Sequence, residues 1–493
     1  MLRFWALFFA IVTCLTACSQ DSPEPPGGAV DADALRAHVN ALQAEDMQGL
    51  QAGTQGYDKA AVYVAEQFSK AGLEPAGVDG SYFQPIGFRH LRILPETAQL
   101  LVQTKDDSVL RLQYGQSYAY FLNPQHPMLD ITAELVFAGY GLTRYDDLDM
   151  QGKIAVVLSG ALDGQTGAGL SLIDNKAADA ARAGAIGLIV VPMGDEGDVA
   201  AFTAQSARAQ QEQSFWTHED GKPFSPIGAL QIMAHMAPDK AYLLFEKASQ
   251  SYAKVLEQAA QGKTISPFDM GMSVTIRASA AERVSVSSNV LGRLPRQATG
   301  DVAATKPAQT VLLLTQLAAN QEGDNALGVA ALLEVAKAMA AVDEPWQRDI
   351  VFAALTAQGN KALGAQFLAD QWPETQGTVA AALALDVPLA PFSGLVAAGG
   401  PHSTLGSLST QIANRSGIEI KPDWDMRPEA YAFAQRGVPS MSLAAIPEAP
   451  SDMPVDWDKA TSLAQVQLDM MRTLASTQQS LVWSEGSVFS SRP

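Results

Sequence analysis

The chain has 493 residues, of which 47% are hydrophobic, and it carries a formal net charge of −19. This length and composition suit about two or three domains with their own hydrophobic cores. The acidic balance argues against nucleic acid as a partner, because phosphate binding needs a basic surface, and equally against adhesion to anionic lipid through a polybasic patch.

The amino-terminal residues 1–17 have the organisation of a lipoprotein signal peptide. An apolar run at 4–15 follows a positive charge and is too short for a membrane span of about 20 residues. The run ends in Leu-Thr-Ala before Cys18, a pattern that resembles the bacterial signal cleaved just before a cysteine. Cys18 would then carry lipid and link the protein to a bilayer. The alternative is an ordinary signal peptide that is cut near Ala17.

The position after Cys18 indicates the destination. Ser19 stands where an aspartate would act as a retention signal, so this class of signals implies sorting to the outer membrane, facing the periplasm. Residues 18–30 are rich in proline, glycine and acidic residues and are predicted to form a disordered tether. The only other cysteine, Cys14, lies inside the predicted signal, so the processed chain is expected to have no disulfide and no cysteine metal site.

Helices and short strands are predicted between the tether and residue 132. One helix is expected to begin near residue 31, and a second covers 57–71 before it stops at Gly72. Strand-like segments follow as far as residue 112.

Three segments within residues 133–276 resemble, in this order, those of a protease-associated insert. The first is Val-Phe-Ala-Gly-Tyr-Gly-Leu at 136–142, and the second is Asp-Met-Gln-Gly-Lys-Ile-Ala-Val-Val at 149–157. The third is an alanine-rich helix that ends at Gly184 and leads into a buried strand ending at Val191. Inserts of this kind are usually non-catalytic lids or interaction surfaces.

From residue 284 onward, apolar strands alternate with helices. Strands are predicted at 311–314, 349–355 and 379–385, and the helix after the first of them has apolar residues spaced three or four apart. This alternation is typical of a mostly parallel sheet, whose active sites lie at the carboxyl ends of the strands. Five residues are predicted to lie there: Gln316, Asp324, Gln358, Gly359 and Asp386.

The motifs at these strand ends resemble those of the zinc aminopeptidase family that also includes glutamate carboxypeptidase, the transferrin receptor and nicastrin. The segment 324–328, Asp-Asn-Ala-Leu-Gly, matches the family's Asp-Asn-Ala-Ser-Gly, which carries the bridging aspartate. Asp386 matches the aspartate ligand of the family's Asn-x-Asp, and Asp452 lies nearest to the place of its last histidine ligand. The resemblance therefore makes Asp324, Asp386 and Asp452 the candidate metal ligands.

The resemblance implies an α/β fold with a mostly parallel central sheet flanked by helices, as in zinc exopeptidases, and an inserted protease-associated α/β domain. In this division residues 31–132 are the amino-terminal part of the peptidase-like domain, 133–276 are the insert and 284–475 are the peptidase-like core. Residues 476–493 are expected to form a loosely packed tail.

The sequence departs from the family at most positions that bind metal or move protons. Gln316 stands in place of the histidine of Ala-His-x-Asp, and Gln358 and Gly359 replace the two glutamates that serve as general base and ligand. The family's Ser-Asp-His reads Pro-Glu-Ala here and ends at Ala430. The amide of Gln358 cannot take a proton from a metal-bound water. No catalytic residue is therefore assigned, and a two-zinc site is expected to be absent.

Two functions remain open on this sequence. The preferred one is a catalytically inactive, lipid-anchored envelope protein that binds or scaffolds another envelope protein or a peptide and needs no cofactor. The alternative is an active metallo-aminopeptidase in which Asp324, Asp386 and Asp452 hold zinc or another divalent cation, with a hard cation favoured by carboxylate ligands. Two of these residues also have structural explanations, since Asp324 could cap the following helix and Asp386 could be a polar residue at a strand end.

Overall fold

The structure, a computed structural model, describes most of the chain. The described residues are 28–47, 51–104, 106, 108–142, 145, 148–161, 169–195, 197–297, 308–317, 325–357, 362–387, 389, 391–448 and 455–490. The predicted signal peptide, Cys18 and the candidate positions Asp324, Gln358, Gly359 and Asp452 lie outside these ranges. What the sequence predicts for them therefore stays a prediction.

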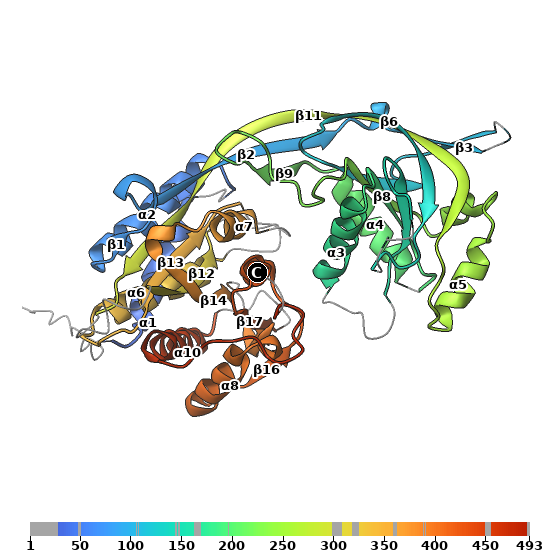
Figure 1. Ribbon diagram of the computed structural model, residues 1–493. Coiled ribbons are helices and arrows are strands. Elements are labelled where there is room, and N and C mark those ends of the chain that lie inside the picture. The colour runs from blue at the N-terminus through green and yellow to red at the C-terminus, as the bar shows by residue number, and fades with distance from the viewer. Residues whose placement is uncertain are drawn as a thin grey trace, which may run out of the picture.

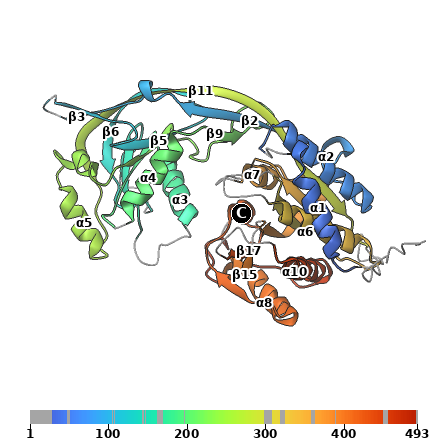
Figure 2. The same cartoon turned by 180° about the vertical axis from the view of Figure 1, so that it is seen from behind.

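Two lobes are joined by a long β-ribbon, as Figure 1 and the view from behind in Figure 2 show. The ribbon consists of β2 (Phe83–Ile93) and β11 (Phe268–Leu294), which pair antiparallel. β9 (Gln213–Trp216) pairs with the other edge of β2, and β1 (Glu74–Pro75) pairs with the end of β11. The 27 residues of β11 contribute to the sheets of both lobes, so this strand is the main connection between them.

The first lobe, called the core lobe here, contains a mixed sheet with parallel strands in its centre. Four parallel strands lie side by side in the order β13 (Asp349–Leu355), β12 (Gln309–Gln316), β14 (Thr378–Asp386) and β17 (Ser440–Pro447). β11 flanks β13, and β15 (Phe392–Ala398) flanks β17 with β16 (Ile420–Asp423) beside it. All seven residues of β13 are buried, as expected for a strand covered on both faces. The predicted mostly parallel sheet is confirmed.

Helices cover both faces of this sheet. On one face lie α1 (Ala32–Leu42), α2 (Gln55–Lys70), α6 (Ala326–Ala340), α8 (Thr404–Ser416) and α10 (Trp457–Ser476). On the other face lie α7 (Leu363–Asp370) and α9 (Pro428–Ala434). Because successive strand residues point to opposite faces, Leu313 belongs to the first apolar cluster and its neighbours Leu312 and Leu314 belong to the second. No helix in the described part of the chain is long and apolar enough to cross a membrane.

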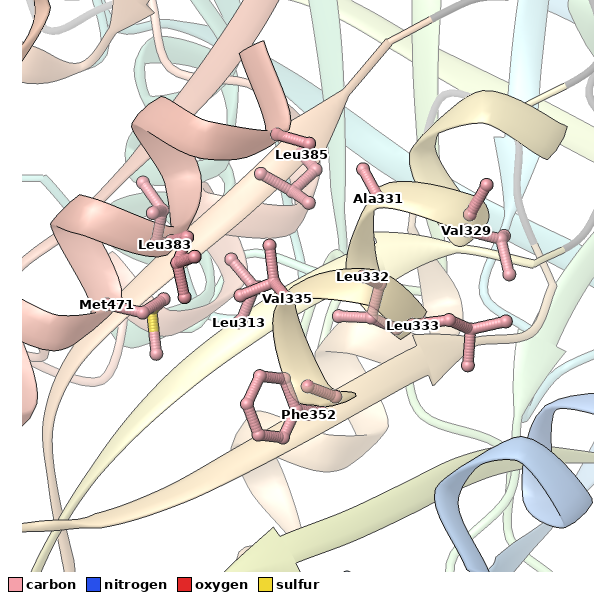
Figure 3. Packing of buried hydrophobic residues seen from close by; sticks show 14 of the residues in the cluster. Leu313, Val329, Ala331, Leu332, Leu333, Val335, Phe352, Leu383, Leu385 and Met471 are labelled. Atoms are coloured by element: carbon pink, nitrogen blue, oxygen red, sulfur yellow. The ribbon is translucent and has the colours of Figure 1, made fainter. Parts of the chain in front are cut away.

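The helix α6 is buried along nearly its whole length. Figure 3 shows its residues Leu332 and Val335 near Leu313 and Phe352 of the strands, and all four belong to one apolar cluster. The helix predicted after the first core strand is thus confirmed. Because α6 is buried on nearly all sides, its apolar residues extend beyond the single stripe of a surface helix.

The second lobe, called the insert lobe, is built on a separate mixed sheet. Its strands follow in the order β4 (Val109–Leu112), β3 (Gln99–Thr104), β11, β6 (Met128–Phe137), β7 (Ile154–Leu158), β8 (Gly187–Val191), β10 (Ile232–Met236) and β5 (Tyr118–Leu122). The lobe also contains the helices α3 (Gly169–Arg182), α4 (Asp198–Ala209) and α5 (Tyr252–Ala260). The predicted α/β architecture of the insert is confirmed.

The boundaries of this lobe differ from those that the sequence predicts. β3, β4 and β5 pair within the insert lobe, so the lobe begins near residue 99 rather than at 133. At the other end, the predicted insert stops at 276 and the predicted core begins at 284, whereas β11 runs through both positions. One continuous strand pairs with β3 and β6 in one lobe and with β2 and β13 in the other. Such long-range pairing is not encoded in a local pattern.

The carboxyl-terminal segment packs onto the core lobe as far as residue 490. Phe489 is fully buried, and its ring centroid lies 5.3 Å from that of His402 and 5.0 Å from that of Trp483. The indole N–H of Trp483 donates a 2.9 Å hydrogen bond to the carbonyl of Gly437. The loose tail expected at 476–493 is therefore not found in the described residues 477–490, because two aromatic side chains hold this segment against the core.

Candidate functional site

Three polar side chains meet where the parallel strands end. Gln316 is the last residue of β12 and Asp386 is the last residue of β14, and these parallel strands end at the same edge of the sheet. Glu429 lies in the first turn of α9, directly after Pro428, whose fixed φ suits the start of a helix. Because α9 packs against β14 and β17, Glu429 reaches the same edge.

Gln316 and Glu429 are in direct contact. Nε2 of Gln316 donates a hydrogen bond to Oε1 of Glu429, although the two residues are 113 positions apart in sequence. Glu429 is only 3% exposed. Burial raises the pKa of its carboxyl to about 7, and the charge of Asp386 acts in the same direction, while a backbone N–H, the Gln316 amide and Arg427 act against it. The carboxyl of Glu429 is therefore only partly ionised at neutral pH.

Asp386 faces a cation at the same edge. Its Oδ2 lies 3.6 Å from Nε of Arg427, and the two side chains are 40% and 49% exposed, so solvent screens the pair. Arg427 directly precedes α9. The ion pair therefore connects the end of β14 with the start of the helix that carries Glu429.

Asn325 supports the end of β12 from the neighbouring helix. It is the N-cap residue of α6, but its side chain does not cap the helix. Instead, Nδ2 donates hydrogen bonds to the hydroxyl of Thr315 at 3.0 Å and to the carbonyl of Gln316 at 2.7 Å. A Cβ at position 328 would lie 2.5 Å from Oδ1 of Asn325, which explains why the motif has Gly328. The motif thus positions the backbone at Gln316.

The backbone is strained on both sides of the segment 358–361. Ala357 has a φ of +52° and Ala362 has a φ of +44°, in the left-handed region that costs a non-glycine residue about 1–2 kcal/mol. Strain of this kind concentrates at functional sites. It flanks the position of Gln358, where the resembled family carries its general base.

The described residues do not fit a zinc site. Zinc is normally held by about three or four His, Cys, Asp or Glu ligands, and no such group placed to hold a metal ion occurs in the part of the chain that the structure describes. Gln316, in the place of a histidine, has its amide bound to Glu429, and Asp386 faces Arg427. Of the three candidate ligands only Asp386 lies within the described residues, and Asp324 and Asp452 lie outside them.

Glu429 is a site residue that the sequence analysis did not single out. The segment 428–430 differs from the family's Ser-Asp-His and was therefore interpreted only as a loss. It nevertheless keeps a carboxylate in the middle position, directly after a proline that begins a helix. That retained acid, together with the glutamine at position 316, was the signal for a polar pair.

Comparisons with known proteins agree with this architecture. Residues 319–482 match the profile of peptidase family M28, and residues 131–223 match that of the PA domain. No curated protein sequence matches the chain.

Solved structures of similar proteins cover nearly the whole chain. An aminopeptidase from Aneurinibacillus sp. strain AM-1 has a TM-score of 0.52 and 18% identity, with 92% of this chain and 96% of that chain covered. A zinc aminopeptidase from Bacillus subtilis has a TM-score of 0.42 and 15% identity, with 94% and 97% covered. At 18% identity, the likeness to the first protein concerns the fold alone. The TM-score of the second protein is too low to support an argument.

The two profile matches fall on the two lobes described above, and the motifs around Asn325 and Asp386 lie at the strand ends where the family places its site. The resemblance to the zinc aminopeptidase family is thus supported by both regions: residues 319–482 of the core lobe are a peptidase family M28 region, and residues 131–223, in the insert, are a PA domain.

Proposed function

We propose that this protein is a lipid-anchored protein of the bacterial envelope that uses the aminopeptidase fold for binding or scaffolding and has lost metal-dependent peptide hydrolysis. The observation that carries the proposal is the hydrogen bond between Gln316 and Glu429. Gln316 stands in the position of the family's first histidine ligand, and its neutral amide is bound to the buried carboxyl of Glu429. Gln358, in the place of the general base, supports the same conclusion from the sequence.

The partner of such a protein would be another envelope protein or a peptide. The net charge of −19 disfavours nucleic acid, and the bilayer would be reached through the lipid on Cys18. The PA domain lies in a lobe with its own sheet and helices, and this lobe offers a surface for a macromolecule next to the core lobe.

The protein from Ser19 onward is expected to bind no zinc and to cleave no peptide. After dialysis against trace zinc, metal content measured by mass spectrometry should stay near zero, compared with roughly two equivalents for a two-metal peptidase. Aminoacyl p-nitroanilides of several residue types should show no hydrolysis above buffer. Stoichiometric zinc together with hydrolysis that a chelator abolishes would contradict the proposal.

The active metallo-aminopeptidase remains the second candidate, because Asp386 stands at a ligand position of the family and its side chain is 40% exposed and thus accessible to a cation. A site rebuilt from carboxylates would favour a hard cation, so the assay is repeated with magnesium and manganese. If metal binds, Asp386→Asn should lower its affinity, whereas Asp425→Asn, an exposed change outside the site, should not.

Lipid attachment at Cys18 is expected to be complete in a bacterium with two membranes. Labelled palmitate should enter the full-length protein, and Cys18→Ser should lose the label entirely because the acceptor thiol is gone. Cys14→Ser, a change four positions earlier, is the matched control and should keep it. Equal labelling of the parent and Cys18→Ser, or an unmodified amino terminus near Ala17 by mass spectrometry, would contradict the prediction.

A further inference from the structure

A histidine on the connecting ribbon makes two short hydrogen bonds to serines. Nε2 of His90, on β2, lies 2.7 Å from Oγ of Ser285 on β11, and its Nδ1 lies 2.8 Å from Oγ of Ser214 on β9. Oε1 of Glu212 is 3.6 Å from the same Nδ1. His90 is directly opposite Ser214 on one neighbouring strand and Arg283 on the other. Cross-strand partners share a face of a sheet, so Ser214, His90 and Arg283 form one row across the three strands.

The charges around His90 select one tautomer. The Glu212 carboxylate favours a hydrogen on Nδ1, which leaves the lone pair of Nε2 to accept the hydroxyl hydrogen of Ser285. Burial and the charge of Arg283 lower the pKa of His90, while Glu212 acts to raise it. The pKa of Glu212 is itself lowered, chiefly by the hydrogen bond from Arg283 at 2.6 Å. At neutral pH the row therefore contains a neutral imidazole, oriented to remove a proton from Ser285, beside an ionised carboxylate.

Gly53 lies beside the side chain of Ser285. Ser285 is half-buried. Gly53 passes beside it with a φ of +79°, and a Cβ at this glycine would lie 3.4 Å from Oγ of Ser285. A side chain at position 53 would thus project onto the hydroxyl, and glycine, which the positive φ also favours, keeps this side of the hydroxyl free of a side chain.

The face of β11 that carries Ser285 also contacts the end of β13 in the core lobe. Two residues along β11 on the same face, Ser287 hydrogen bonds to Oγ1 of Thr356 at 2.7 Å. Thr356 follows β13 and precedes the strained Ala357. Ser285 and His90 lie on this face of the ribbon, and neither belongs to the pair Gln316 and Glu429.

We propose that Ser285 is a nucleophile with His90 as its general base, and that it reacts with carboxylic esters or comparably activated acyl compounds. Glu212 and Ser214 act as positioning residues for the imidazole. In the first step Oγ of Ser285 bonds to the acyl carbon, its proton passes to Nε2 of His90, and the bond to the alkoxy group breaks as that group takes the proton from Nε2. Water then attacks the acyl-serine with the same base, which releases the acid and restores the hydroxyl.

The test is covalent labelling of the protein from Ser19 onward with a fluorophosphonate probe. Peptide mass spectrometry should find the adduct on Ser285, and Ser285→Ala should lose it. His90→Gln should react at least about 100-fold more slowly, within the range that general bases contribute. Ser287→Ala, two residues away on the same face, is the matched control and should label at the parent rate. No adduct on Ser285, or an unchanged rate in His90→Gln, would overturn the proposal.

The pH dependence of labelling separates catalysis from a structural tie between strands. The rate should fall as pH drops through the pKa of His90, which lies below its usual value. Glu212→Gln removes the charge that raises this pKa and should move the acid limb to lower pH; Arg283 is the other charged group that acts on His90. If His90→Gln fails to fold, the shift of the acid limb in Glu212→Gln is the deciding measurement. A labelling rate with the same pH dependence in Glu212→Gln and the parent would contradict the proposal.

Discussion

At pH 8 the Glu429→Gln variant is expected to be more stable than the parent protein, by about 3 kcal/mol, and the difference is expected to vanish below pH 4.5. Burial raises the pKa of this carboxyl from 4.5 to about 7 in the folded state. Its protonated form therefore contributes stability that is fully present below the unfolded pKa and is lost as pH rises through 7. Glutamine stays neutral and still offers an oxygen to the Gln316 amide, so the variant does not lose this contribution.

The measurement is urea unfolding of parent and variant between pH 4.5 and 8. Glu419→Gln makes the same chemical change at an exposed position and should leave the pH dependence as in the parent. Identical pH profiles of the parent and Glu429→Gln would show that the buried carboxyl does not titrate near neutrality in the folded protein.

The Arg348→Met variant is expected to lose about 3–5 kcal/mol of stability. The Arg348 guanidinium is 4% exposed and donates to the backbone carbonyls of Leu474, Thr477 and Gln479 at 2.8, 2.6 and 2.9 Å. These carbonyls belong to the end of α10 and to the segment behind it, which have few other donors because a helix leaves its last carbonyls free. Methionine keeps much of the volume but leaves buried acceptors without a partner.

Thermal and urea unfolding measure this loss, and hydrogen exchange locates it. The segment 477–490 should exchange faster in Arg348→Met, since its anchor to the core is gone. Arg415→Met, at an exposed position on α8, is the control and should change stability by less than about 0.5 kcal/mol. Equal stability of the two variants would mean that the carbonyls find other donors, and protection of 477–490 would then be unaffected.

Local patterns predicted much of the core lobe. The apolar runs at 311–314 and 349–355 became buried strands, and the spacing of apolar residues after position 325 became α6. These elements could be predicted from sequence because each has a local signal. The helix shows apolar residues three or four positions apart, and a central parallel strand is apolar on both faces. The profile of the PA domain likewise falls on a segment whose motifs the sequence already displayed.

The ribbon and the lobe boundary were not accessible in the same way. β11 crosses from one lobe to the other within 27 residues and runs through the domain boundary that the sequence predicts between 276 and 284. The pairing of β11 with β3, β6, β2 and β13 depends on segments that lie more than fifty residues away in sequence. The proximity of His90, Ser285 and Ser214 is a consequence of that pairing, so it could not be predicted before the register was known.

The sequence by itself determined the family resemblance, the alternation of strands and helices, and the loss of both histidine ligands, a glutamate ligand and the glutamate general base at the expected positions. Those are properties of short segments and of single residue types. Only the tertiary structure decided that Gln316 contacts Glu429 and that Asp386 faces Arg427, since these contacts form between elements far apart in the chain. The physical reason is that burial and neighbouring charge, which set the pKa of Glu429, exist only after β12, β14 and α9 have packed together.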